Sequence, residues 1–263
     1  MMNKHFLTCT LFLVFFLLPF SLAAKDLGLL LDQSSSYESS GNEAELKYFG
    51  TLIPWFSSSI GDAADLYISA GVTAGYEYKE LQIVPELLRT ELTFLTGENG
   101  ELRIGRINYT DPLGFIANGL FDGVHYSIEL GEGPVLGMGV WYTGLLYKKN
   151  AYITMTEFDL EEYNTLVDYA DFSGTYFAPR RLVAAIDWEH PGIAELVRLR
   201  LALIGQFDLS GRDTLYHTQY LTAKLSIPVN DFVYEVGGIA ELAQASKEYS
   251  VSFAGELGIA WEL

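Results

Sequence analysis

Hydrophobic and polar residues alternate along most of the chain, most regularly over its last fifteen residues. From Tyr249 to Leu263 every second residue is apolar, aromatic or glycine, and the residues between them are small, hydroxylated or anionic. A period of two is that of an extended strand, whose two faces then differ in polarity. Such a strand suits a soluble core with a solvated back, or a membrane barrel with lipid outside and water inside.

The same alternation recurs in segments that turn residues separate. They predict strands at residues 26–33, 43–56, 63–78, 82–95, 100–108, 120–130, 135–147, 179–189, 193–208, 213–228, 231–243 and 248–263. Most have about 9–16 residues, which exceeds the roughly five or six typical of soluble sheets and suits a tilted bilayer crossing. Pro54 and Pro85 argue against two of these strands, because proline cannot donate a hydrogen bond to a neighbouring strand.

Charged and small polar residues occupy the second face of these strands. In residues 193–208, for example, leucines alternate with Arg198 and Arg200. A dry sandwich core could not satisfy such a face. We therefore predict an all-β fold, a transmembrane antiparallel up-and-down β-barrel of about 12 strands, within a range of about 10–14. A soluble β-sandwich or a lipocalin-like barrel is the alternative.

The first 24 residues predict a secretory signal peptide. A basic Lys4 precedes an apolar run from Phe6 to Phe20, and the small-x-small pattern Ser21-Leu22-Ala23 follows. The run is short for a spanning helix, although an uncleaved membrane anchor is the alternative. Removal of residues 1–24 leaves residues 25–263, which we predict to form a single barrel domain that is exported through the periplasm.

Charge and cysteine content narrow the function further. The net charge is −18, from 16 basic and 34 acidic residues, and loss of Lys4 leaves 15 against 34, or about −19. Nucleic acid repels such a chain, so we expect no nucleic-acid partner. Cys9 is the only cysteine and lies in the predicted leader, so the mature chain has no disulfide and no thiolate metal site.

The predicted connections differ in length between the two sides of the sheet. With a periplasmic amino terminus, the even-numbered connections are the short turns 57–62, 96–99, 131–134, 190–192 and 229–230. The long connections, 34–42, 109–119 and 148–178, fall on the other side, although three further connections there, near 79–81, 209–212 and 244–247, are also short. Short periplasmic turns with longer outer loops are typical of outer-membrane barrels.

Two of the long connections invite functional hypotheses. Residues 148–178 are acidic and aromatic, and they could gate a mouth, bind a partner or bind Ca²⁺, but we favour a solvated surface loop. Their spacing does not match an EF-hand. Residues 109–119 contain Leu113, Phe115 and Ile116, so this loop is expected to fold into the barrel mouth or to pack on a neighbouring subunit.

The carboxy terminus carries a more specific pattern. Glu256-x-Gly258-x-x-Trp261-x-Leu263 sets a polar residue, glycine, an aromatic residue and a terminal hydrophobic residue at fixed spacing. It resembles the insertion signal of bacterial outer-membrane β-barrel proteins, although an aromatic residue is commoner in the place of Leu263. The resemblance implies a porin-like barrel of the bacterial outer membrane, inserted by the outer-membrane assembly machinery. It names no solute.

Charged residues of the polar parity predict the lining of a pore. They are Arg181, Arg198, Arg200, Lys224, Glu235, Glu241 and Glu256, with a second group of Arg89, Glu91 and Arg103. A two-residue turn at 229–230 would set Lys224 opposite Glu235, and a 244–247 loop would set Glu256 opposite Glu235. Segregated charges of this kind can select ions, although cross-strand salt bridges explain the first group equally well and the second group better.

These patterns predict passive diffusion of small hydrophilic solutes or ions through an outer-membrane channel. The alternative is a non-conducting surface barrel whose acidic loop binds a partner. We predict no enzyme, cofactor or metal, because His125, His190 and His217 belong to no recognisable catalytic or metal-binding spacing. The expected partners are the lipid bilayer, the assembly machinery and small polar solutes, and homo-oligomerisation is left open.

Overall fold

A computed structural model describes residues 26–40, 43–77, 80–131, 133–154, 156–193 and 196–261. The predicted leader at residues 1–24 and Leu263 lie outside these ranges. By contact density the chain divides into two compact units, residues up to Leu92 and residues from Thr93 onward.

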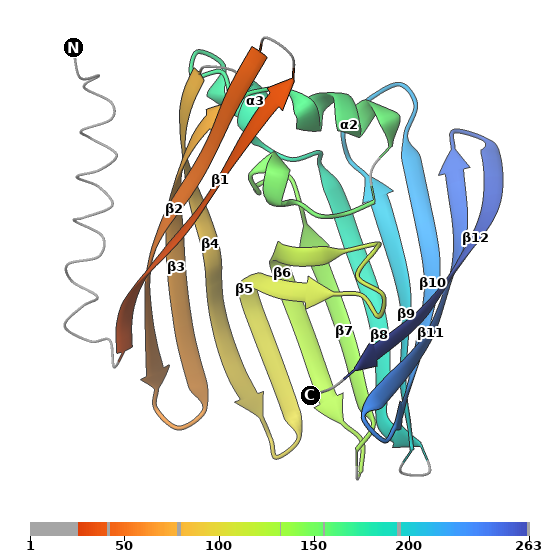
Figure 1. Cartoon of the computed structure of the whole chain (residues 1–263). Coiled ribbons are helices and arrows are strands. Elements are labelled where there is room, and N and C mark those ends of the chain that lie inside the picture. Colours follow the sequence, from red (N-terminus) through yellow and green to blue (C-terminus); the bar gives the residue numbers. More distant parts are fainter. Residues whose placement is uncertain are drawn as a thin grey trace. The chain divides into compact units, whose positions relative to one another are not determined.

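Twelve antiparallel strands follow one another in a single up-and-down sheet, in the order β1 to β12 (Figure 1). Their bounds are β1 (Asp26–Ser40), β2 (Glu43–Ile60), β3 (Ala64–Glu77), β4 (Glu80–Thr96), β5 (Gly100–Thr110), β6 (Asn118–Glu129), β7 (Val135–Tyr142), β8 (Arg181–Ile193), β9 (Val197–Asp208), β10 (Tyr216–Val229), β11 (Phe232–Ala245) and β12 (Glu248–Trp261). The all-β class, the strand number and the meander topology predicted from the sequence are confirmed.

Three predictions about the first unit need correction, of which the simplest concerns Pro85, which lies inside β4 and does not break it. Residues 34–40 are not an outer loop but the second half of β1, where they pair with β2 from Phe49 to Glu43. Pro54 does not break β2 either: the paired positions between β2 and β3 run from Tyr48 to Leu52, omit residues 53 and 54, and resume at Trp55. A proline is tolerated where it owes no hydrogen bond to the neighbouring strand.

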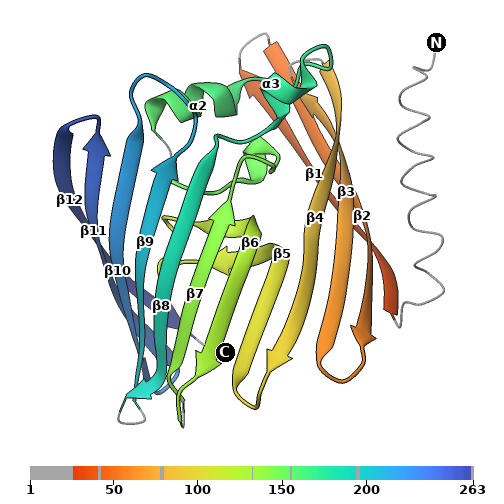
Figure 2. The ribbon, with the colours of Figure 1, turned by 180° about the vertical axis from the view of Figure 1, so that it is seen from behind.

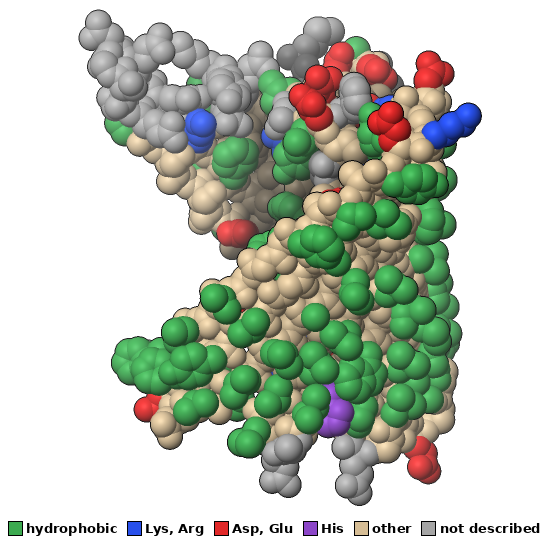
Figure 3. All heavy atoms as spheres, turned by 90° about the vertical axis from the view of Figure 1, so that its right-hand side faces the viewer, with side chains coloured by type: hydrophobic (Ala, Val, Ile, Leu, Met, Phe, Trp, Pro, Cys, Tyr) green, Lys and Arg blue, Asp and Glu red, His purple; other side chains and the backbone are tan. Residues whose placement is uncertain are grey.

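The second unit contains strands β5 to β12, whose two faces differ as the alternation predicts. On the apolar face Leu203, Leu221 and Leu257 are 54%, 56% and 84% exposed. On the polar face of the same strands, Ile204 and Thr222 are fully buried. Hydrophobic side chains form a broad band on the surface shown in Figure 3. The buried positions of this unit therefore lie mainly on the face that carries its polar residues.

Segments of the chain itself cover that polar face. Strand β6 pairs with β5 as far as Asn118, but it pairs with β7 only from Asp122 onward, so the tip of the β5–β6 hairpin leaves the sheet. Figure 1 shows this tip lying across the face of β7 to β9. Gly105 has a φ of +117° at the bend, a conformation that L side chains rarely adopt.

The connection between β7 and β8 is longer than predicted. Strand β7 ends at Tyr142 rather than near residue 147, because the Thr143 hydroxyl bonds backbone atoms of Pro179 and Arg181 and starts a turn. The connection contains η1 (Lys148–Asn150), α2 (Glu157–Asn164) and α3 (Phe172–Tyr176). Helix α2 lies across the ends of the neighbouring strands (Figure 2), and a capping box of Thr156 and Asp159 fixes its first turn.

The last two hairpins are shifted by two residues from the predicted register. Asn230 with φ +55° and Ser246 with φ +54° begin two-residue turns at 230–231 and 246–247. As a result Glu235 lies opposite Ser226 and Gly258, and Glu256 lies opposite Gly237. A shift of two residues keeps every side chain on its predicted face, so only the opposing partners change.

Candidate functional site on the polar face

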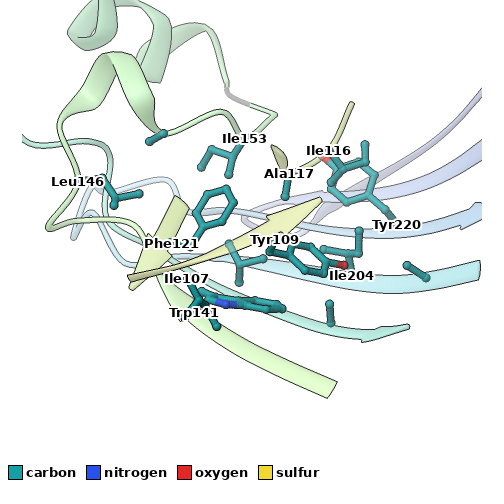
Figure 4. Close-up of a cluster of buried hydrophobic side chains, with 14 of the residues drawn as sticks. Ile107, Tyr109, Ile116, Ala117, Phe121, Trp141, Leu146, Ile153, Ile204 and Tyr220 are labelled. Carbon is teal, nitrogen blue, oxygen red and sulfur yellow. The ribbon is translucent and has the colours of Figure 1, made fainter. Parts of the chain in front are cut away.

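A dry hydrophobic cluster covers part of the polar face in the second unit (Figure 4). The strands contribute Ile107, Tyr109, Phe121, Trp141, Val183, Ala185, Ala202, Ile204 and Tyr220, and the connections contribute Ile116, Ala117, Leu146, Ala151, Ile153 and Ala178. Most of these side chains are less than 5% exposed. The strand alternation did not predict this cluster, because its strand members occupy positions that the pattern assigns to water.

One buried carboxylate shapes the turn between β5 and β6. Asp111 is fully buried, and its two oxygens accept hydrogen bonds from the backbone N–H groups of residues 113, 114, 116 and 117 at 2.8–3.1 Å. We call residues 111–117 the strap. The carboxylate replaces the partners that these amides would find in water, so the strap keeps its shape within a dry environment.

The strap spans several strands of the polar face. The Gln206 side chain of β9 donates a hydrogen bond to the Ile116 carbonyl at 3.3 Å. A Cβ placed on Gly237 of β11 would lie 2.3 Å from Leu113 Cδ2, so Leu113 rests on a site that only glycine leaves open. The loop at residues 109–119 thus packs on the polar face of its own unit, whereas its predicted place in a barrel mouth or on a neighbouring subunit stays a prediction.

A buried ion cluster holds α2 against the strand ends, and we call Asp159, Arg181 and Arg212 the latch. Asp159 is 1% exposed, and its oxygens lie 2.5 Å from Arg181 Nη2 and 2.9 Å from Arg212 Nη1. Burial alone would raise the pKa of Asp159, but the hydrogen bonds from Arg181 and Arg212 outweigh burial and hold that pKa below its usual range. Asp159 therefore stays ionised at neutral pH.

The acidic connection is thus not simply the solvated surface loop that we favoured. Lys148 is also buried; its ammonium group donates to the Glu162 carbonyl at 3.0 Å and to the Thr165 hydroxyl. Burial, reinforced by neighbouring Lys149, lowers the pKa of Lys148. The remaining acids Glu157, Glu161, Glu162, Asp168 and Asp171 do face solvent. Among these acids only Asp159 is buried, because it lies on the face of α2 that meets the strand ends.

Away from the cluster, most of the predicted pore-lining charges occur as ion pairs. Arg198 and Arg200 both contact Glu189, and Lys224 Nζ lies 2.9 Å from Glu235 Oε1 despite the shifted register. These side chains are between 21% and 56% exposed. The charged side chains of the polar face therefore pair with one another and remain partly accessible to solvent, as expected for charges that line a water-filled lumen.

The remaining predicted residues lie as follows. Arg181 is 2% exposed beneath α2, Glu241 accepts a hydrogen bond from Ser252, and half-buried Glu256 lies on the same face as Glu235. Arg103 contacts Glu101. In the first unit Arg89 pairs with Glu91 at 2.7 Å and lies over the Tyr67 ring. Gly258 and Trp261, which we predicted to belong to an insertion signal, lie in β12, and Trp261 is exposed.

Sequence reasoning missed one polar group at the edge of the cluster. The Tyr109 hydroxyl donates to Asp187 Oδ1 at 2.7 Å, and His125 Nε2 lies 3.9 Å from Asp187 Oδ2. Arg103 Nη2 lies 3.0 Å from His125 Nδ1. We had predicted no Asp–His pair, and this one comes from strands more than sixty residues apart. Gly137 between them was the available signal, because its absent side chain leaves room for the His125 ring.

No protein-family model and no curated protein matches the sequence. Among the residues that the structure describes, no group of three or more His, Cys, Asp or Glu side chains could hold a metal ion. Within the same ranges, no helix is long and apolar enough to cross a membrane.

Proposed function

We propose that the protein is a porin-like β-barrel of the bacterial outer membrane that conducts small hydrophilic solutes or ions by passive diffusion. The observation that carries the proposal is the division of β5 to β12 into an exposed apolar face and a charged, partly solvated one. Contiguous exposed apolar surface of this extent is costly in water and marks a membrane or partner surface. A lipid-facing band with polar residues on the opposite face is the pattern of membrane barrels.

Channel activity is inferred from the ion pairs outside the cluster. Glu189, Arg198 and Lys224 retain substantial exposure, so they require water on the polar face. In a barrel this water would form the solute path, and fixed charges along the path would select ions. The exported location and the insertion-signal role of Glu256, Gly258, Trp261 and Leu263 belong to the same proposal.

Reconstitution into planar bilayers tests this function. We expect stepwise conductance from the mature chain, and a shift of selectivity toward cations when Arg198 and Arg200 are both replaced by Glu. The matched control replaces exposed Arg180 and Lys247 by Glu, which changes the net charge equally but outside the strands. Equal selectivity of the two double variants would contradict a role for the arginines in the solute path.

A second candidate function is favoured by the dry cluster. A polar face filled by its own chain suits a non-conducting surface barrel, as in narrow barrels that side chains fill. The exposed acids of the β7–β8 connection would then contact a partner. Protein that inserts into vesicles and shows heat-dependent gel mobility, yet stays silent in planar bilayers, would favour this function over the channel.

A further inference from the structure

The two segments that cover the polar face contact each other and could move away from the strands together. We propose that the hairpin tip at residues 107–121 and the connection at residues 143–154 and 156–180 form a plug that can leave the polar face, with the latch controlling its release. This inference rests on the proposed channel, whose solute path the plug would close. It concerns only the second unit.

The plug is attached to the sheet mainly by side chains. Before Asp122 strand β6 does not pair with β7, and the hairpin tip instead pairs with the connection through a bridge between Ala117 and Ile153. The Asn118 N–H donates to the Tyr152 carbonyl at 2.9 Å, and the Thr154 N–H donates to the Ile116 carbonyl at 2.9 Å. Backbone hydrogen bonds thus join the two segments to each other, as in a unit that moves together, while the connection bonds the backbone beside it at its two ends, where the Thr143 N–H donates to Arg181 and the Arg180 carbonyl accepts from Leu209.

The strand face under the plug carries polar atoms that would form hydrogen bonds with water. Gln206 Oε1 and Thr222 Oγ1 are fully buried and have no hydrogen-bond partner among the described residues. A buried polar atom without a partner is costly, and water would satisfy both atoms once the plug moved away. The closed arrangement thus carries a built-in cost, which the hydrophobic cluster and the latch must overcome.

The latch is the buried ionic attachment of α2 to the rest of the unit, and the exposed Glu162 of α2 adds a second ion pair to Arg212 at 2.8 Å. Asp159 belongs to the plug, whereas Arg181 begins β8 and Arg212 lies in the β9–β10 connection. Removing one member of a buried ion pair leaves the other charge uncompensated, which is far more disruptive than removing an exposed pair. Neutralising Asp159 should therefore shift the plug toward release without changing any strand.

A cysteine reporter measures release directly. Residues 25–263 contain no cysteine, so Ala202→Cys, in the cluster and 1% exposed, provides a single thiol under the plug. In vesicles, we expect Asp159→Asn to speed labelling of this thiol by a small water-soluble maleimide about tenfold or more. Glu161→Gln, the control on the exposed side of α2, should leave the rate unchanged.

A second variant acts in the opposite direction and preserves folding. Thr222→Val is nearly isosteric and removes an unpaired buried hydroxyl, so it should strengthen the closed state and slow labelling. This outcome keeps the test decisive if Asp159→Asn does not fold. Equal labelling rates in the parent, Asp159→Asn and Thr222→Val proteins would overturn the plug.

Conductance measurements test the plug hypothesis and the channel hypothesis separately. We expect Asp159→Asn to raise the conductance of reconstituted protein, and a Leu113→Cys, Gly237→Cys disulfide to suppress it until a reductant is added. Responsive labelling in protein that never conducts would support a movable plug and refute the channel. Conductance with unresponsive labelling would support the channel and refute the plug.

Discussion

The strap provides the most direct test of how a buried loop is stabilised on the polar face of the sheet. Replacing Asp111 by Ala removes the acceptor of four backbone N–H groups, of which the amides of Ile116 and Ala117 form buried hydrogen bonds. Hydrogen bonds to a charged group contribute about 1.5–3 kcal/mol each, so the buried pair accounts for about 3–6 kcal/mol of local stability. The two outer bonds share the same carboxylate and are not counted separately.

Amide hydrogen exchange measures this loss where it occurs. Asp111→Ala should speed exchange of the Ile116 and Ala117 amides by about a hundredfold or more, since about 1.4 kcal/mol corresponds to a factor of ten. Asp111→Asn keeps one acceptor oxygen, so the exchange rates of these two amides should lie between those of the parent protein and those of Asp111→Ala. Asp213→Ala, at an exposed loop position, is the control. Unchanged exchange at Ile116 and Ala117 in Asp111→Ala would refute the structural role of this carboxylate.

Further predictions concern the bend, the cluster, the latch and insertion. Gly105→Ala, at φ +117°, should lower stability by about 1–3 kcal/mol in urea unfolding, whereas Gly255→Ala, whose Cβ would meet only the Gly237 carbonyl oxygen at an ordinary 3.7 Å, should not. Tyr109→Phe leaves a buried carboxylate oxygen without its donor and should cost about 1–3 kcal/mol by the same assay; an unchanged midpoint would contradict the contact. Because the pKa of Asp159 is lowered, latch stability is complete above the unfolded Asp pKa of about 3.9 and is lost as pH falls below it; labelling of the Ala202→Cys thiol that rises between pH 7 and pH 5 relative to labelling of an exposed Lys247→Cys thiol would contradict this. Trp261→Ser should reduce the heat-modifiable form in outer-membrane fractions, and an unchanged amount would argue against the insertion signal.

The local alternation of apolar and polar residues was enough to predict the strands of the sheet and their order. Strand residues alternate with a period of two, and each hairpin joins neighbours in the chain, so strand number, order and face follow from nearby residues alone. Leu257 and Glu256 fall on their predicted faces for this reason. Register is less local, since it depends on which turn residue adopts a positive φ. Asn230 and Ser246 therefore moved both predicted pairings by two residues.

Only the tertiary structure showed which residues of the polar face are buried by other segments of the chain. Polar parity made Arg181 look like a water-facing residue, but α2 buries it against Asp159, which lies 22 residues earlier in the chain. Likewise Asp187, His125 and Tyr109 meet across three strands, and no spacing in the sequence records that meeting. A period of two tells which face a side chain occupies, and the packing of distant segments decides whether that face meets water or protein.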